Sequence, residues 1–346
     1  MKKIVMAVLL SIFVLAGVNA GAQQGEKDNV KATDIKIHKK QALSDDERKA
    51  LDKAKGKPSA LGDKAVFKPL ATGVLGEPIP TGGEKYAIVV GLANYSGTAN
   101  DLCITAAETA DQFPEDNGNL TAYCQDYDSV HMREALINEY GYDKSNIIFL
   151  RDGRATKANI IDAMNQVRTK LVGKDDEVVF FFSGHGASGK YYGIKDREII
   201  DEAIYTYDNK FIWDDDLKQW ADSLSVYRAV FAFDICLAGG MNDLAGTNRV
   251  LAMSSGETQS SWTYSLGGST SIDGTTYYSE GLFSHYFVED GMNNGLADGS
   301  NLLSKVDGGV AIEEAFSYAY PIVKVKQIPV LNDKFYNDLL LGYQVN

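Results

Sequence analysis

Cysteine and histidine, the residues that most often act as nucleophiles, bases or zinc ligands, are scarce in this sequence. Its 346 residues include three cysteines, Cys103, Cys124 and Cys236, and four histidines. Three cysteines are too few for a disulfide-rich secreted scaffold. The histidines show no zinc-ligand spacing with the cysteines, which argues against a zinc site. An odd number of cysteines leaves at least one thiol unpaired.

Positive charge and long hydrophobic runs are also in short supply. The formal net charge is −13, and residues 24–68 carry +4 of their own, from 12 Lys and Arg against 8 Asp and Glu. With Lys2 and Lys3 set aside, this leaves −19 for residues 69–346. An acidic body argues against nucleic-acid binding and predicts an attraction between the body and the basic leader. The sequence leaves the oligomeric state open.

The first 22 residues have the pattern of a secretory signal peptide. Lys2 and Lys3 precede an apolar run from Ile4 to Val18, and small residues follow that run. This pattern predicts export to the periplasm or the cell exterior. A membrane anchor is the alternative, because the run falls just short of a membrane-spanning helix. No later segment is long and apolar enough to span a bilayer, so we expect a mature protein without a membrane span.

The remaining chain divides into a polar leader with its linker, residues 23–80, and one predicted domain, residues 81–346. The leader segment "SDDERKALDKAKG" predicts a helix, because Ser44 and Glu47 form a capping box and Gly56 provides a stop. From Glu84 onward, apolar strand-like segments alternate with amphipathic ones. Strands are predicted at 85–95, 146–152, 176–186, 226–236 and 248–256, and helices at 126–141, 156–173 and 214–224. Such alternation predicts a three-layer α/β/α sandwich with a mostly parallel central sheet.

Two of the predicted strands end in residues that can do chemistry. "VVFFFSGHG" ends at His185 and Gly186, and "VFAFDIC" ends at Cys236, 51 residues after the histidine. Taken singly, such a cysteine is most often a small core residue and such a glycine-rich segment a turn. In a parallel sheet both side chains emerge at one edge, where a thiol and an imidazole make a nucleophile and its base. The backbone N–H of Gly186 could then stabilise an oxyanion.

Several motifs together resemble the caspase-like superfamily of cysteine peptidases, and within it the metacaspases and their bacterial and archaeal relatives. The resemblance spans about Lys85 to Asp333 and is carried by "YAIVVGLANYSGTANDL", "FFFSGHG", "IWDDDL", "FDICLAG", "LAMSSGETQSSW", "GLFSHYF" and "KQIPVLND". It implies a caspase-like fold and an endopeptidase that works through a thioester and needs no cofactor for its chemistry. Cys236 would be the nucleophile, His185 the general base and acid, and the N–H groups of Gly186 and Cys236 the oxyanion hole.

The same resemblance implies a substrate pocket. Asp234 and Ser183 match its residues, and a further aspartate falls at Asp128, with Asp126 left open as the alternative. A carboxylate in a concave pocket selects a cation. We therefore expect protein or peptide substrates with Arg or Lys at the cleaved position.

The resemblance also implies a calcium site, and an insertion that departs from the family pattern carries two cysteines. Asp214, Asp215 and Asp243 match a calcium site of metacaspases, and carboxylate oxygens suit Ca²⁺. Cys103 and Cys124 bracket an insertion relative to the family. In an exported protein they either form a disulfide or remain two reduced thiols.

Three alternatives remain at this stage. One is a caspase-fold binding or scaffold protein with a silent site, and another is a legumain-like or gingipain-like peptidase with a different specificity. The third concerns the leader, which is either a disordered spacer or an inhibitory pro-segment. In the second case Lys55, Lys57 or Lys68 would enter the acidic pocket before being cut.

Overall fold

The computed structural model describes most of the chain from residue 32 onward. The described residues are 32–53, 71–97, 100–102, 126–170, 173, 175–192, 199–265, 269–270, 276–277, 279–300, 303 and 305–344. They belong to a single compact unit, Ala32–Asn346.

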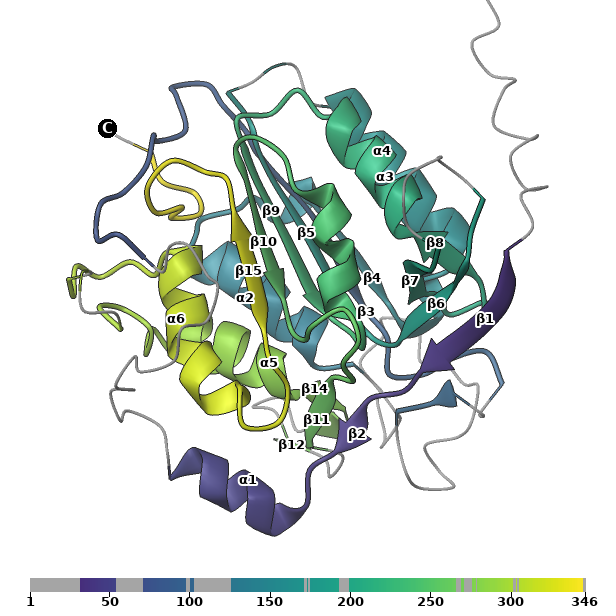
Figure 1. The fold of residues 1–346 in the computed structure, drawn as a ribbon. Helices are drawn as coiled ribbons and strands as arrows, with labels where there is room; N and C mark the ends of the chain where they lie inside the picture. Colours follow the sequence, from purple (N-terminus) through teal and green to yellow (C-terminus); the bar gives the residue numbers. More distant parts are fainter. Residues whose placement is uncertain are drawn as a thin grey trace, which may run out of the picture. The chain divides into compact units, whose positions relative to one another are not determined.

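A six-stranded sheet organises this unit, with strand order β15-β10-β9-β5-β3-β4. Its strands are β3 (Lys85–Gly91), β4 (Ile147–Arg151), β5 (Glu177–Ser183), β9 (Arg228–Asp234), β10 (Arg249–Met253) and β15 (Val330–Asp333). Neighbours pair in parallel except at β15, which is antiparallel to β10. The mostly parallel central sheet predicted from the sequence is therefore confirmed (Figure 1).

Helices cover both faces of the sheet, as expected for the sandwich. One core contains residues of α2 (Asp128–Asn138), α5 (Leu282–Ser284), the π-helix η6 (His285–Asn293) and α6 (Ile312–Val323). The other contains residues of α3 (Lys157–Lys170), α4 (Asp214–Ser223) and the 3₁₀ helix η5 (Ala238–Leu244). Short 3₁₀ turns η3 (Lys144–Asn146) and η4 (Asp152–Arg154) flank β4. Successive residues of a central strand point into opposite cores. In β5, Val179 and Phe181 lie in the first core, and Phe180 and Phe182 lie in the second. This is why the strands are apolar at every position.

Smaller sheets surround the carboxyl ends of the central strands. One has the order β1-β6-β7-β8, with β1 (Thr33–His38), β6 (Gly186–Lys190), β7 (Asp201–Tyr205) and β8 (Phe211–Trp213). Another has the order β14-β11-β2, with β2 (Gln41–Ala42), β11 (Trp262–Ser265) and β14 (Glu280–Gly281). The strands β12 (Ser269–Thr270) and β13 (Thr276–Tyr277) form a pair. The sequence patterns predicted none of these strands.

The leader contributes β1, β2 and the helix α1 (Asp45–Asp52) to this arrangement. The predicted capping box is present, since the Ser44 N–H donates to Glu47 Oε2 at 2.8 Å and the Glu47 N–H donates back to Ser44 Oγ at 3.4 Å. The helix ends at Asp52, and the predicted stop at Gly56 lies outside the described residues. In Figure 1 the purple leader runs from β6 to β11 along the ends of the central strands.

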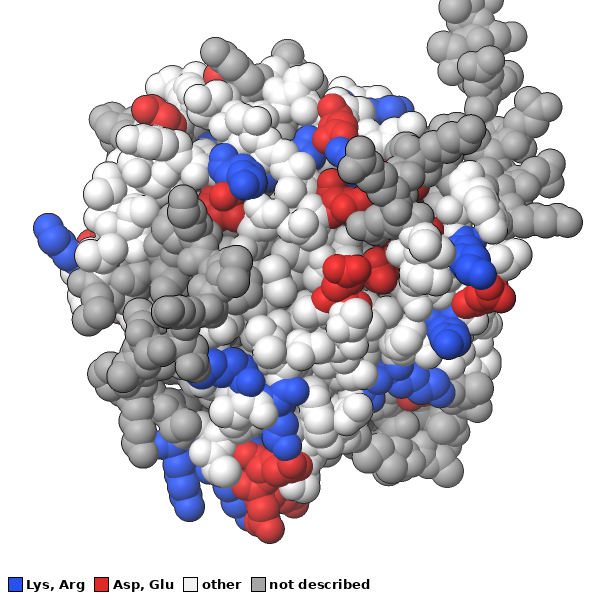
Figure 2. Space-filling view, in the orientation of Figure 1, with Lys and Arg blue, Asp and Glu red and all other residues white. Residues whose placement is uncertain are grey.

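Two properties of the described part bear on the expected partners. Its helices include none with the length and apolarity needed to cross a membrane. In the space-filling view, basic and acidic side chains are interspersed over the visible face, so the described residues form no extended basic patch there (Figure 2). The predicted signal peptide lies outside the described residues.

Candidate active site

The two motifs predicted to meet do meet, at the carboxyl ends of β5 and β9. These strands pair in parallel with Ser183 opposite Asp234, so the residues two positions further on emerge at the same edge. The two turns approach so closely that a Cβ atom on Gly186 would lie 2.0 Å from the Cys236 carbonyl oxygen, and only glycine fits. Directly after Cys236, Leu237 adopts a left-handed conformation with φ 62°, which turns the chain sharply out of the strand.

His185 is fully buried and held in one orientation. Its Nε2 atom lies 2.9 Å from the Asn100 carbonyl oxygen, and its ring stacks on Tyr95 with centroids 5.1 Å apart. The His185 N–H donates to Tyr95 Oη at 2.8 Å. Among the described residues, the other ring nitrogen, Nδ1, has no hydrogen-bond partner, so it is the nitrogen available for proton transfer. Burial lowers the pKa of His185 to about 3. Tyr95 and Asn100 lie within the quoted motif "YAIVVGLANYSGTANDL", but sequence reasoning did not single them out as partners of His185.

Cys236 is also fully buried, and the Ser261 N–H donates to its Sγ atom at 3.2 Å. Burial raises the pKa of the Cys236 thiol to about 11, although the Ser261 N–H favours the thiolate. Cys236 is the free cysteine of the described residues. Both shifts disfavour the ionised thiolate–imidazolium form of the pair.

The predicted pocket residues Asp234, Asp128 and Ser183 do lie together, and all three are buried. Ser183 Oγ donates to Asp128 Oδ2 at 2.5 Å. Asp128 also accepts the Gly281 N–H at 2.9 Å, and Asp234 accepts the Ser284 N–H at 2.9 Å. Burial, together with the charge of Asp234, raises the pKa of Asp128 to about 6.

Of the two aspartates left open by the sequence, Asp128 is the one that lies beside Ser183. Asp126 accepts the Ser129 N–H at 2.8 Å and so satisfies a backbone donor at the start of α2. Asp128 faces Ser183 and the pocket.

A lysine of the leader fills the pocket. Lys40 Nζ lies 3.1 Å from Asp234 Oδ1 and 3.8 Å from Asp128 Oδ2, and it donates to Ser183 Oγ at 3.2 Å. The Lys40 side chain is 1% exposed. Burial alone would lower its pKa, but the charges of Asp234 and Asp128 outweigh burial and raise it. The lysines predicted for this place, Lys55, Lys57 and Lys68, lie outside the described residues, as do Cys103 and Cys124.

Of the predicted calcium ligands, Asp214 and Asp215 begin α4, and Asp243 lies in η5. Asp214 is buried and accepts the Glu202 N–H at 3.1 Å, and burial, with the charges of Asp201 and Asp243, raises its pKa to about 8. This crowding of carboxylates is the oxygen chemistry that Ca²⁺ prefers. Among the described residues, however, Asp214, Asp215 and Asp243 are not a group whose ligand atoms converge.

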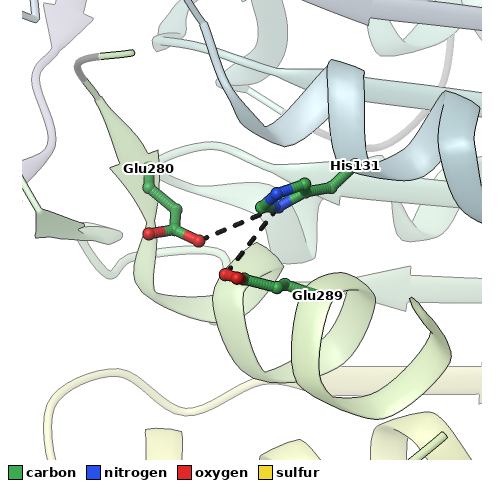
Figure 3. A group of neighbouring side chains, drawn as sticks. All are labelled: His131, Glu280 and Glu289. Atoms are coloured by element: carbon green, nitrogen blue, oxygen red, sulfur yellow. Dashed lines mark ion pairs between the residues drawn. The ribbon is translucent and has the colours of Figure 1, made fainter. Parts of the chain in front are cut away.

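One group of potential metal ligands does converge among the described residues. His131 of α2, Glu280 of β14 and Glu289 of η6 point toward one another (Figure 3). His131 Nδ1 lies 3.9 Å from Glu280 Oε1 and 3.8 Å from Glu289 Oε2. His285 Nδ1 lies only 2.8 Å from each of the same two carboxylates, which outweigh burial and raise its pKa to about 10. The two carboxylates of this group are thus already paired with His285.

A histidine and a cysteine at the ends of adjacent parallel strands in an α/β/α sandwich define a caspase-like domain. The sequence comparison is more specific, because residues 87–245 match the family model of the metacaspase, peptidase C14 domain. Over these residues the chain is similar to the metacaspases. The resemblance inferred from the motifs is confirmed.

Curated relatives agree with this assignment. Metacaspase-1 of Schizosaccharomyces pombe is 27% identical over 178 residues, which cover 48% of this chain and 36% of that protein. Metacaspase-1 of Kluyveromyces lactis is 28% identical over 213 residues, which cover 55% of this chain and 44% of that protein. The chain therefore spans less than half of the length of these relatives.

Two solved structures are similar to the chain at low identity. A protein from Geobacter sulfurreducens is 18% identical with a TM-score of 0.46, and the match covers 72% of this chain and 92% of that one. Caspase-1 from Spodoptera frugiperda is 12% identical with a TM-score of 0.44, and the match covers 83% of this chain and 97% of that one.

Proposed function

We propose that this protein is an exported cysteine endopeptidase that hydrolyses peptide bonds after Arg or Lys. The single observation that carries the proposal is a buried lysine side chain bound to two aspartates beside a cysteine and a histidine. The match to the metacaspase peptidase domain supports peptide-bond hydrolysis as the class of reaction. The lysine in the pocket supports the specificity.

The first half of the reaction acylates the enzyme. The Cys236 thiol gives its proton to Nδ1 of His185, and Sγ attacks the carbonyl carbon of the substrate. The negative charge on the carbonyl oxygen is stabilised by the backbone N–H groups of Gly186 and Cys236. As the C–N bond breaks, His185 returns the proton to the leaving amine and a thioester remains.

The second half of the reaction hydrolyses the thioester. His185 takes a proton from water, the resulting hydroxide attacks the thioester carbon, and the C–S bond breaks. The carboxylic acid leaves, and His185 returns its proton to Sγ of Cys236, which restores the thiol. No cofactor takes part in either half. The bond from Nε2 to the Asn100 carbonyl oxygen keeps the ring oriented through both transfers.

The specificity follows from the charge of the pocket. Asp234 and Asp128 place two buried carboxyl groups around one cation, and Ser183 adds an acceptor. A substrate side chain ending in a carboxylate would face uncompensated repulsion there, whereas Arg and Lys would be bound.

Hydrolysis of fluorogenic peptides tests the proposal. Peptides ending in Arg, Lys, Asp or Asn are compared with and without added calcium. The assay uses the wild-type protein and the Lys40→Ala variant, whose pocket is free of the chain's own lysine. We expect hydrolysis after Arg and Lys, and no hydrolysis after Asp.

Cys236→Ala in the same Lys40→Ala background is the matched control. Hydrolysis that survives this control would assign the activity to a contaminant. A preference for Asp or Asn would overturn the proposed specificity and favour a caspase-like or legumain-like pocket.

A further inference from the structure

Lys40 is bound in the pocket as a substrate side chain would be. Lysine is almost never fully buried unless its charge is paired, and Lys40 Nζ has an ion pair with Asp234, a second with Asp128 and a hydrogen bond to Ser183. The pocket that is proposed to select the substrate is thus satisfied by the chain itself.

The backbone on either side of Lys40 is added to strands that flank the reacting groups. Before Lys40, β1 pairs antiparallel with β6, with His38 opposite Gly186, the oxyanion-hole residue. After Lys40, the Gln41 N–H donates to the Ser261 carbonyl oxygen at 3.1 Å. Ser261 is also the residue whose N–H contacts the Cys236 thiol. The leader therefore passes from one side of the reacting pair to the other.

A third contact anchors the leader beyond β2. Leu43 and Leu51 are buried in the core formed under the sheet by α2 and α6. Asp52 Oδ1 accepts hydrogen bonds from Tyr264 Oη at 2.9 Å and from Tyr286 Oη at 3.1 Å. Apolar burial holds this end irrespective of charge.

The reacting groups are inaccessible in this arrangement. His185 and Cys236 are both 0% exposed, although a peptidase must admit a peptide to them. Their pKa values are shifted away from the ionised pair by the same burial. The position of the leader explains both the inaccessible reacting groups and the pocket occupied by Lys40.

We propose that residues 33–52 are a tethered inhibitor, in which Lys40 occupies the acidic pocket and the strands on either side of it cover the Cys236–His185 pair. This inference rests on the proposed function for its biological meaning, since it makes the described chain a zymogen. The proposed inhibitory lysine is Lys40, which lies at least fifteen residues before the lysines suggested by the sequence. Activation then requires the segment around Lys40 to leave the site.

The test measures access to Cys236 in the full-length protein without requiring turnover. Iodoacetamide alkylation of the Cys236 peptide is followed by mass spectrometry in the wild type and in the Lys40→Ala and Lys40→Glu variants. We expect alkylation to be about tenfold faster or more in both variants, because each breaks a buried ion pair, and fastest for Lys40→Glu, which adds repulsion. The Lys40 charge lowers the pKa of the Cys236 thiol, so its removal disfavours the thiolate, and faster alkylation reports access.

Lys39→Ala is the matched control, because Lys39 is the exposed neighbour of Lys40. It should alkylate like the wild type. Leu51→Asp withdraws the anchor helix from the core without touching the pocket, and it should also expose Cys236. Thermal melting of each variant shows that it is folded.

Each outcome separates this inference from the proposed function. Faster alkylation without peptide hydrolysis in any variant upholds the tethered inhibitor and overturns the peptidase. Faster alkylation together with faster hydrolysis after Arg supports both. Equal alkylation of the wild type, the folded Lys40 variants and Leu51→Asp overturns the tethered inhibitor, whatever the hydrolysis.

Discussion

The neutral, buried imidazole of His185 predicts a measurable loss of stability in acid. His185 is 0% exposed, and burial lowers its pKa from 6.5 to about 3. The unfolded chain therefore binds a proton as the pH falls through 6.5, while the folded chain does not bind one until about pH 3. In this window the unfolded state binds more protons, so the free energy of unfolding falls as the pH falls.

The magnitude follows from the two pKa values. With about 1.4 kcal/mol for each pKa unit, this single histidine should remove about 3 kcal/mol from the free energy of unfolding between pH 7 and pH 4. Asp128, Asp214 and Glu280 have raised pKa values, so their contributions to stability change with the opposite sign. The effect of His185 must therefore be read as a difference between matched proteins.

Urea unfolding followed by tryptophan fluorescence at several pH values provides that difference. His185→Phe keeps a ring against Tyr95 but cannot titrate. Between pH 7 and pH 4 its free energy of unfolding should therefore fall by about 3 kcal/mol less than that of the wild type. His38→Phe is the control, because His38 is only half buried and should change the pH profile much less. Parallel pH profiles for the wild type and His185→Phe would refute the account of a histidine kept neutral by burial.

Three further outcomes are expected. Cys236→Ala in the Lys40→Ala background should abolish peptide hydrolysis and leave the melting temperature close to that of Lys40→Ala; comparable turnover by the folded variant would show that another group is the nucleophile. Asp234→Asn, in the background whose own lysine has been removed, should lower kcat/KM after Arg and Lys by roughly 10- to 150-fold, the equivalent of about 1.5–3 kcal/mol for a hydrogen bond to a charge. Glu177→Gln should lower the free energy of unfolding by about 3–5 kcal/mol, because it leaves the buried Arg228 guanidinium without its carboxylate at 2.8 Å. Lys218→Ala, at an exposed helix pair, should cost under about 1 kcal/mol in the same urea titration, and equal losses would contradict the burial argument.

The sequence determined the sandwich, and the placement of His185 and Cys236 at one edge of its sheet, through local pattern. Runs such as residues 177–183 are apolar at every position because both faces of the strand are covered, and that pattern needs no partner to be recognised. The capping box of Ser44 and Glu47 is equally local, and it was predicted at the right residues. His185 and Cys236 could be brought together from sequence because parallel neighbours present their ends at one edge.

Only the tertiary structure decided which lysine meets the acidic pocket and which aspartate lines it. Lys40 is 194 residues from Asp234 in the sequence, and nothing in the pattern around it distinguishes it from the other lysines of the leader. Its place depends on β1 and β2 adding to β6 and β11, and short strand pairings between distant segments have no signature within either segment. Asp126 and Asp128 are likewise only two residues apart. Their hydrogen bonds in the fold distinguish them, because Asp126 accepts the Ser129 N–H near the start of α2, whereas Asp128 accepts the Ser183 hydroxyl in the pocket. The local sequence pattern determines where a helix or strand forms and which of its faces are buried. The partner of a buried charge depends instead on which distant segment of the chain packs an opposite charge against it.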